Sequence, residues 1–392
     1  MKFATKAIHS GEISLEKLKP VITPIFQTSN YLLDDEIYKA FLEGRGRDVW
    51  IYTRHGNPTR RAVEEKIAAL EGGEDALVVS SGMGAVASVL FTYLRPGDHM
   101  VTSKHLYGGS LGLISMLEER FGTKVSYSLP DHPEGIIDAA TSETKLFFFE
   151  SISNPLLRPF LMEGVVEFAR RRGIKIVVDN TFLSPYNFNP LQYGADLVIH
   201  SATKYLGGHS DLLSGVVVGN REEVERVWRT YVTLGPTADP LSCFLLERSL
   251  KTLHVRMERH NSNALEVARV LDEHPGVDWV IYPMLEHYYE PDYAGRHFRG
   301  GGGMVTFKIK GGNEDGVLFM RGLKIVKEAA SLGGVESLVS MPFNTSHYAL
   351  TDEERQALGI EPGTIRLSVG IEDVEDILSD LDQALGGIGG GE

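Results

Sequence analysis

Cysteine is almost missing from this chain of 392 residues, and long apolar runs are missing altogether. Cys243 is the only cysteine, which excludes an intrachain disulfide framework and predicts a small buried hydrophobe at that position. No run approaches the roughly 20 apolar residues that cross a membrane, and residues 1–6 lack the apolar stretch of a secretory signal. We therefore expect a cytoplasmic protein with no membrane partner.

Positive charge is also scarce, since 39 Lys and Arg face 53 Asp and Glu, for a formal net charge of −14. A net negative chain repels phosphate backbones and anionic lipid, so we expect neither nucleic acid nor a membrane surface as a partner. An anionic ligand would need a local cluster of hydrogen-bond donors that works against the overall charge.

The apolar residues that are present predict two domains behind an irregular arm. Pro20, Pro24 and Pro58 interrupt residues 1–60, where few apolar residues are periodic. Continuous apolar runs then alternate with helical stretches, which is typical of a sheet covered by helices on both faces. We predict such strands at 76–80, 100–102, 145–150, 175–180, 197–202 and 215–219.

A change of pattern near residue 240 marks the second domain. A long amphipathic helix is predicted at 240–271, then strands at 277–282, 304–309 and 365–369 and a terminal helix at 373–385. The predicted fold class is α/β, with an arm at 1–60, a large, mostly parallel sheet domain at 61–250 and a smaller α+β domain at 251–392.

The predicted strand ends carry unusual residues, and ligands of open α/β sheets bind outside the carboxyl ends of the strands. The stretch from Ser80 to Ala85 (SSGMGA) follows a strand and opens a helix, where backbone N–H groups and the helix dipole favour an anion. A dinucleotide fingerprint would need glycine in place of Ser88. The stretch therefore indicates either a phosphate-binding turn or an ordinary tight turn.

Lys204 closes another predicted strand (LVIHSA), and a lysine at the end of a buried strand is costly unless the protein uses it. The hydroxyls of Ser201 and Thr203 can hold a phosphate while the lysine amine forms an imine. Desolvation lowers the pKa of such a lysine, as Schiff-base chemistry requires. The alternative is a lysine whose amine reaches solvent and does no chemistry.

Two further strand ends carry Asp179 and the stretch from Glu150 to Pro155. An ionised carboxylate after the apolar run KIVV needs a cationic partner, and the pyridinium nitrogen of pyridoxal phosphate is one. Asp179 would otherwise be a capping or turn residue. The second stretch places the polar amide of Asn154 at its strand end.

Along the sequence, the possible phosphate turn is followed by Asn154, Asp179 and Lys204. With these features in this order, the chain resembles the transsulfuration (Cys/Met metabolism) family of pyridoxal phosphate-dependent enzymes. That family includes methionine γ-lyase, cystathionine γ-lyase, cystathionine γ-synthase and the homoserine-ester sulfhydrylases, and the resemblance implies their fold-type-I architecture. It runs from about residue 5 to residue 385 and is most specific at 52–59, 178–182, 201–211 and 331–337.

The resemblance implies the cofactor pyridoxal 5'-phosphate, held as a Schiff base on Lys204, which also moves protons. Asp179 would pair with the ring nitrogen, and Tyr107 would stack on the ring and give a proton to the leaving thiol. Two of the residues that hold the cofactor, Tyr52 and Arg54, would reach the phosphate bound in a neighbouring subunit. The cofactor-binding set is Tyr52, Arg54, Gly82, Met83, Tyr107, Asn154, Asp179, Ser201, Thr203 and Lys204.

The same resemblance implies a homo-oligomer, a dimer with shared active sites that assembles into a tetramer. Arg366 would bind the substrate carboxylate, assisted by Asn154, with Ser331 beside them. We expect no metal, because His200 and His209 lack a cysteine or a neighbouring carboxylate to complete a tetrahedral set.

Ile51 and Ala330 bear on the substrate, because cystathionine-cleaving relatives tend to carry glutamate at these positions. Without those acids, the pocket for the end of the substrate far from its α-carbon becomes apolar. Such a pocket suits the methyl group on the thioether sulfur of methionine. Gly109, however, stands where methionine-specialised relatives commonly have cysteine. We predict γ-elimination from methionine, homocysteine or cystathionine, giving 2-oxobutanoate, ammonia and a thiol. The alternatives are γ-replacement on a homoserine ester, with which Gly109 is also compatible, and a non-catalytic cofactor-binding protein.

Overall fold

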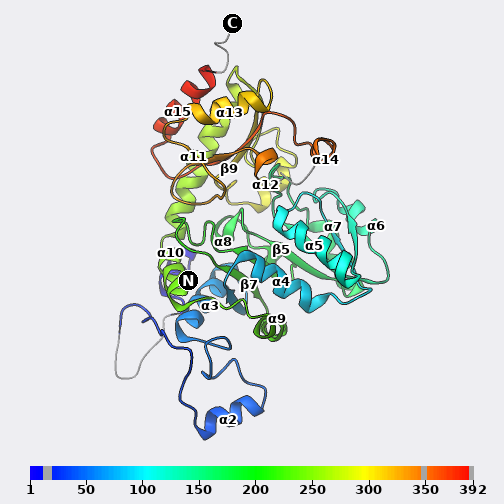
Figure 1. The fold of residues 1–392 in the computed structure, drawn as a ribbon, viewed down its shortest axis with the longest axis vertical. Coiled ribbons are helices and arrows are strands. Elements are labelled where there is room, and N and C mark those ends of the chain that lie inside the picture. Colours follow the sequence, from blue (N-terminus) through cyan, green and yellow to red (C-terminus); the bar gives the residue numbers. More distant parts are fainter. Residues whose placement is uncertain (12–19, 346–350, 388–392) are drawn as a thin grey trace.

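Two sheets, each covered by helices, organise the chain, and the computed structural model describes residues 1–11, 20–345 and 351–387. The units built on these sheets follow one another along the long axis of the molecule, with α2 at one end and α13 and α15 at the other (Figure 1). No helix in the described ranges is long and apolar enough to cross a membrane.

The large sheet has seven strands in the order β1-β7-β6-β5-β4-β2-β3. The strands from β2 to β6 pair in parallel, while β7 runs antiparallel to both β1 and β6. Their bounds are β1 (Asp75–Val79), β2 (His99–Thr102), β3 (Lys124–Tyr127), β4 (Thr144–Glu150), β5 (Lys175–Asp179), β6 (Leu197–Ser201) and β7 (Gly215–Gly219). The predicted large, mostly parallel sheet is thus confirmed.

Continuous apolar runs form these strands because both faces of the sheet are buried. In β4, Phe147 and Phe149 enter one core, and Phe148 between them enters the other. The first core includes residues of α1 (Phe3–His9), α3 (Pro58–Glu71), α7 (Glu163–Arg172) and α10 (Pro240–Leu250). The second includes α4 (Gly82–Tyr93), α5 (Gly108–Phe121) and α9 (Arg221–Leu234).

The smaller sheet has five strands in the order β10-β11-β12-β9-β8. Their bounds are β8 (Val277–Ile281), β9 (Met304–Ile309), β10 (Lys327–Glu328), β11 (Leu338–Ser340) and β12 (Thr364–Ser368). Its core is shared with α11 (Leu253–Glu273), α13 (Asn313–Gly322) and α15 (Val374–Gly386). The remaining α-helices are α2 (Asp35–Leu42), α6 (Pro133–Asp138), α8 (Ser184–Asn187), α12 (Pro291–His297) and α14 (Asp352–Ala357).

The single helix predicted at 240–271 is wrong, because the structure has two helices, α10 and α11, in its place. The carbonyl of Ser249 accepts from the hydroxyl of Thr252 at 3.1 Å and from Nη2 of Arg256 at 2.9 Å. These side chains compete with the helical hydrogen-bond pattern at the junction. Arg256 also donates to the carbonyl of Tyr205 at 2.7 Å, so a tertiary contact to the loop after β6 sets the break.

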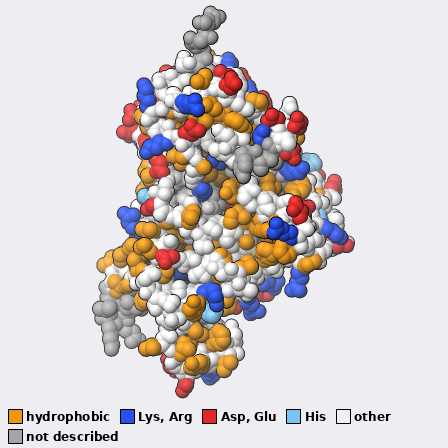
Figure 2. Space-filling view, in the orientation of Figure 1, with side chains coloured by type: hydrophobic (Ala, Val, Ile, Leu, Met, Phe, Trp, Pro, Cys, Tyr) orange, Lys and Arg blue, Asp and Glu red, His pale blue; other side chains and the backbone are white. Residues whose placement is uncertain are grey.

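The first 60 residues are less irregular than predicted, since they include α1 and α2. Helix α1 packs against α3 and α11, whereas α2 projects from the body of the molecule (Figure 1). Apolar side chains stay exposed along this projecting part, with Leu32 95% and Leu42 85% exposed. Figure 2 shows such side chains gathered at this end of the molecule.

Candidate active site

A cavity of about 680 Å³ lies at the carboxyl ends of β4, β5 and β6, the edge of the sheet where ligands were expected. Residues of the large sheet domain line most of it, and residues of the smaller domain close it. Ten of the predicted site residues line this cavity: Gly82, Met83, Tyr107, Asn154, Asp179, Ser201, Thr203, Lys204, Ser331 and Arg366.

Lys204 lies just after β6, and its Nζ donates to Oγ of Ser331 at 2.8 Å. Burial, together with the positive charge of Arg366, lowers the pKa of the Lys204 ammonium from 10.5 to about 8. A lysine amine must lose its proton before it can attack a carbonyl carbon. The cavity therefore favours the nucleophilic form of this lysine close to neutral pH.

Asp179 ends β5 directly beside Glu150 at the end of β4, and the two residues are partners in the register of the sheet. Burial raises the pKa of Asp179, while the hydroxyl and backbone N–H of Thr181 and the charge of His200 lower it. Burial and the neighbouring Asp179 carboxylate raise the pKa of Glu150 well above its usual value. A cation in this cavity would relieve the repulsion between the two carboxylates.

The turn before α4 is built to receive an anion. Ser81 caps the helix by accepting the N–H of Gly84 at 3.0 Å, and the first N–H groups of an α-helix have no partner within it. Ser201 and Thr203 bring hydroxyls to the same cavity from the end of β6. A side chain at Gly82 would place its Cβ 2.8 Å from Cβ of Ser201, so glycine permits this close approach.

Glu150 is the residue that sequence reasoning missed, although it belongs to the stretch singled out for Asn154. Its Oε1 accepts the backbone N–H of Tyr107 at 2.7 Å, and its Oε2 accepts that of Asn154 at 3.2 Å. A carboxylate at the end of an apolar strand was the signal, but its two partners became visible only in the fold. Glu150 fixes the backbone of both residues at the cavity wall.

Arg366, in β12, reaches the cavity from the smaller domain. Its Nη1 donates to Oδ1 of Asn154 at 3.2 Å and its Nη2 to the carbonyl of Ser331 at 3.4 Å. Burial lowers its pKa to about 10, but the group remains a cation at neutral pH. A buried guanidinium with no carboxylate among these partners is suited to an incoming carboxylate.

Tyr52 and Arg54 are the two predicted site residues that do not line the cavity of their own chain. They lie in the arm, where the guanidinium of Arg54 stands 5.4 Å from the centre of the Tyr52 ring. Arg60 anchors this loop, donating to the carbonyls of Thr53 at 3.2 Å and His55 at 2.8 Å. Of the two substrate indicators, Ala330 lines the cavity and Ile51 does not.

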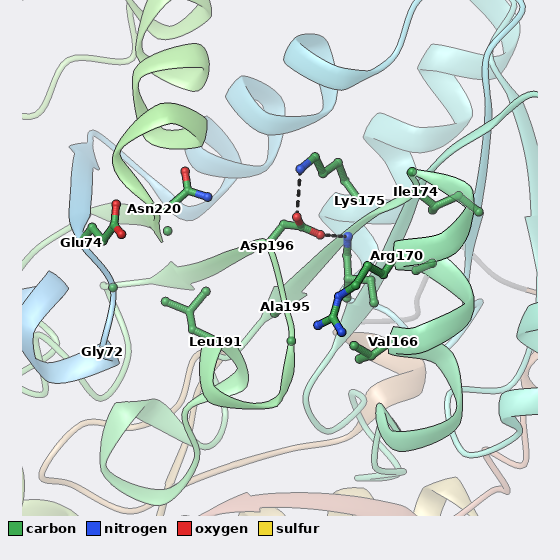
Figure 3. A pocket seen from close by; sticks show the side chains of 16 residues that line it. Gly72, Glu74, Val166, Arg170, Ile174, Lys175, Leu191, Ala195, Asp196 and Asn220 are labelled. Atoms are coloured by element: carbon green, nitrogen blue, oxygen red, sulfur yellow. Dashed lines mark hydrogen bonds and ion pairs between the residues drawn. The ribbon is translucent and has the colours of Figure 1, made fainter.

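A second cavity, of about 450 Å³, lies near the opposite edge of the large sheet, where β5 begins (Figure 3). None of the predicted site residues lines it. Nζ of Lys175 lies 2.9 Å from Asp196 and 2.7 Å from Glu223, so the lysine charge is already neutralised. This cavity therefore offers no comparable chemistry.

No group of three or more His, Cys, Asp or Glu side chains in the described part of the chain could hold a metal ion. Of the two histidines considered above, His200 contacts Glu71 and His209 contacts the carbonyl of Gly207. The first cavity instead combines N–H and hydroxyl donors for a phosphate, a buried carboxylate for a ring nitrogen and a lysine for an aldehyde. Its residues fit pyridoxal phosphate.

Residues 4–386 match the family described as Cys/Met metabolism PLP-dependent enzymes. The chain belongs to this family. It is 40% identical to the L-methionine gamma-lyase of Porphyromonas gingivalis over 386 residues, which cover 98% of this chain and 96% of that protein. It is 39% identical to the cystathionine gamma-lyase of Dictyostelium discoideum over 385 residues, or 98% of this chain and 97% of that one.

Solved structures of family members have the same fold. The structure of metB from Corynebacterium glutamicum superposes with a TM-score of 0.93 at 36% identity, covering 99% of this chain and 98% of that chain. That of cystathionine gamma-lyase from Lactobacillus plantarum, complexed with L-serine, gives 0.93 at 33% identity, with 99% of each chain covered. The predicted family, fold class and dependence on pyridoxal phosphate are confirmed.

Replacing Arg366 with Gln removes a positive charge that lowers the pKa of Lys204, so that pKa will rise above about 8. In cofactor-free protein, the rate of pyridoxal phosphate uptake, followed by visible absorbance across pH, will show its inflection at higher pH than in wild type. The exposed Arg259→Gln is the control and will leave the inflection in place. An unchanged inflection in Arg366→Gln would contradict the electrostatic coupling.

Proposed function

We propose that this protein is a lyase that eliminates the γ-substituent of a sulfur amino acid, namely methionine, homocysteine or cystathionine. The products are 2-oxobutanoate, ammonia and a thiol. The observation that carries the proposal is that one cavity is lined by Lys204, with its lowered pKa, by the carboxyl group of Asp179 and by the guanidinium of Arg366. The similarity to proteins named methionine and cystathionine gamma-lyases supports it.

The chemistry divides between the cofactor and side chains of the cavity. Pyridoxal phosphate, when bound, supplies an electron sink that acidifies the Cα–H bond of the amino acid joined to it. Asp179 would keep the ring nitrogen cationic. The backbone N–H groups in the turn before α4, together with the hydroxyls of Ser201 and Thr203, would hold the phosphate. Lys204 Nζ would remove the Cα proton, release that proton, and as a neutral amine again remove a Cβ proton; the electrons of the Cβ–H bond would form the Cβ–Cγ double bond as the γ-sulfur leaves.

Arg366 and Asn154 bind the substrate carboxylate in this scheme. Their existing hydrogen bond, 3.2 Å from Nη1 to Oδ1, aligns the guanidinium before the substrate arrives. Ser331 lies next to both the lysine and the arginine, since its Oγ accepts from Lys204 and its carbonyl accepts from Arg366. These contacts orient Cα–H toward the base, and orientation of this kind accounts for a large part of enzymatic rate enhancement.

Tyr107 is our candidate for the acid that protonates the leaving sulfur. It is 49% exposed at the cavity wall, and Glu150 fixes its backbone through the 2.7 Å hydrogen bond. Gly109 leaves space beside its ring, because a Cβ there would lie 2.5 Å from Tyr107 Cε1. A cysteine at this position would displace the ring, so the tyrosine has its present position because residue 109 is glycine.

The lining favours an apolar substrate end. Ala330, Leu332, Leu213 and Ile152 contribute apolar surface, and the carboxylates among the described lining residues are Asp179 and Glu150 alone. Asp179 is assigned to the ring nitrogen and Glu150 accepts the backbone N–H groups of Tyr107 and Asn154, so neither acid is spare to bind an ammonium at the far end of a substrate. This supports a thioether substrate without a second charged group, such as methionine.

We further propose that the arm completes the site of a second copy of the chain. Tyr52 is 41% exposed and lies with Arg54 outside the cavity of its own chain, and apolar side chains line the projecting arm. Exposed apolar surface of this kind marks an interface. We propose a dimer in which Tyr52 and Arg54 bind the neighbour's cofactor phosphate, assembled into a tetramer in the cytoplasm. The arm spans 1–60, before domains at 61–250 and 251–392.

Three substrates given separately to the purified protein test the reaction. We expect 2-oxobutanoate and ammonia from L-methionine at a rate at least equal to that from L-cystathionine, because the lining around Ala330 is apolar. Release from cystathionine alone would leave γ-elimination in place but would contradict the preference for an apolar substrate end such as that of methionine. Product formed only from O-acetyl-homoserine together with an added thiol would establish γ-replacement and overturn the proposed function.

Tyr107→Phe tests the acid. The variant should keep the visible absorbance of the bound cofactor, but its elimination rate should fall by about a hundredfold, the usual contribution of a general acid. Tyr127→Phe, at the edge of the large sheet and outside the cavity, is the matched control. A Tyr107→Phe enzyme with the full elimination rate would refute the assignment.

Mixed dimers test the shared site. Lys204→Ala and Arg54→Ala should each be inactive as homo-oligomers. Co-expressed chains should regain activity, because a mixed dimer has one site with both Lys204 and the partner's arginine intact. If Arg54 served the site of its own chain, each variant chain would carry a defective site and mixing would restore nothing.

A further inference from the structure

A buried polar cluster of Glu71, Asn180 and His200 ties the ends of β5 and β6 together on the face of the sheet covered by α3. Glu71 is the last residue of α3, and its Oε2 lies 3.0 Å from Nε2 of His200. The other carboxylate oxygen of Glu71, Oε1, accepts from Nδ2 of Asn180 at 3.4 Å. Glu71 and Asn180 are fully buried and His200 is 1% exposed. None of the three lines the cavity.

Stability does not account for this cluster. Burying a carboxylate and an imidazole in an apolar core costs free energy that their attraction barely repays. The pairing is also incomplete, because Nδ1 of His200 and Oδ1 of Asn180 are buried without a hydrogen-bond partner in the described structure. An apolar trio of similar volume would serve the core as well, so the cluster has another role.

Asn180, just after β5, and His200, in β6, each lie next to a residue of the cavity in the sequence. Asn180 follows Asp179, and His200 precedes Ser201, while successive side chains of a strand point to opposite faces. The strand ends are joined on the cavity side too, since Thr181 donates its N–H to Asp179 at 3.0 Å and accepts that of Ser201 at 2.8 Å. Asp179 and Ser201 are therefore held from both faces.

The cluster also acts on Asp179 through charge. Charge on His200 lowers the pKa of Asp179, and Glu71 contacts that imidazole, with its Oε2 3.0 Å from Nε2 of His200. Glu71 therefore contacts a residue whose charge bears on Asp179.

We propose that Glu71, acting through His200 and Asn180, is a positioning residue for the cofactor. It sets the spacing between Asp179 and Ser201, which hold the ring nitrogen and the phosphate at opposite ends of pyridoxal phosphate. This inference rests on the roles given above to Asp179 and Ser201, and it does not depend on which substrate is cleaved.

Glu71→Gln holoenzyme tests the proposal against a matched control, Glu247→Gln. Glu247 is also a buried glutamate, 2% exposed, but it lies on α10 and its carboxylate is 3.7 Å from Lys251, away from the strand ends. The measurements are the dissociation constant of pyridoxal phosphate, the visible circular dichroism per bound cofactor and the melting temperature. Circular dichroism reports the orientation of the cofactor ring, which a purely structural role would not change.

We expect Glu71→Gln to weaken cofactor binding by about tenfold or more, as removal of a carboxylate behind a ligand does at metal sites, and to alter the circular dichroism of the cofactor that stays bound. Glu247→Gln will change only the melting temperature. Glu71→Asp keeps the charge and will recover part of the affinity. Combining Glu71→Gln with His200→Asn will add little to either single change, because both act through one contact.

Equal losses of melting temperature in Glu71→Gln and Glu247→Gln, with cofactor affinity and circular dichroism unchanged, would overturn the proposal. If Glu71→Gln does not fold, Glu71→Asp is compared with Glu247→Gln in its place, by the same three measurements. The outcome is separable from the reaction itself, since a wild-type protein that binds cofactor but eliminates nothing from sulfur amino acids would refute the proposed function while the binding and spectroscopic comparison still decides the role of Glu71.

Discussion

Parallel pairing of β4, β5 and β6 brings three unlike residues, Glu150, Asp179 and Ser201, to one edge of the large sheet. The chain reaches this edge three times because each crossover returns it to the amino end of the next strand. Every other feature of the cavity is arranged around these strand ends. Helix α4 directs its first N–H groups at the edge, the loop after β6 adds Lys204, and the smaller domain closes the space with Ser331 and Arg366.

Charged groups in the cavity shift one another's pKa values, in a protein whose net charge is −14. Arg366 helps to lower the pKa of Lys204, and Asp179 helps to raise that of Glu150. In the cavity, N–H groups, hydroxyls and a guanidinium outnumber the acids, as anionic ligands such as a phosphate and a carboxylate require. The local set of donors expected from the sequence is therefore present where an anion would bind.

Most of the large sheet could be predicted because its strands are continuous apolar runs that need burial on both faces. The edge strand β3 was missed, since Lys124 and Tyr127 are exposed and the strand has no such run. The break between α10 and α11 was missed because it depends on the contact of Arg256 with Tyr205, 51 residues away in sequence. Local periodicity cannot show a contact of that kind.

The site residues also divide into those visible in the local sequence and those that depend on contacts between distant residues. Lys204 and Asp179 were predictable because a charged residue ending an apolar strand is unusual in the sequence itself. The part played by Glu150 became visible with its partner Tyr107, and that of Glu71 with His200, which is 129 residues distant. The assignments of Tyr52 and Arg54 came from family resemblance and remain predictions, since neither lines the cavity of its own chain.

Two hydrogen bonds cross from one domain to the other inside the cavity, Lys204 to Ser331 and Arg366 to Asn154. Apart from Tyr52 and Arg54 in the arm, the groups assigned to the cofactor lie in the large domain, while Arg366, Ser331 and Ala330 belong to the smaller one. The two contacts therefore tie the position of the smaller domain to the strand ends of the large one. A small rotation of one domain against the other would displace Arg366 and the hydroxyl partner of Lys204 in the same movement, so the grip on an amino acid and the placement of the base are mechanically coupled.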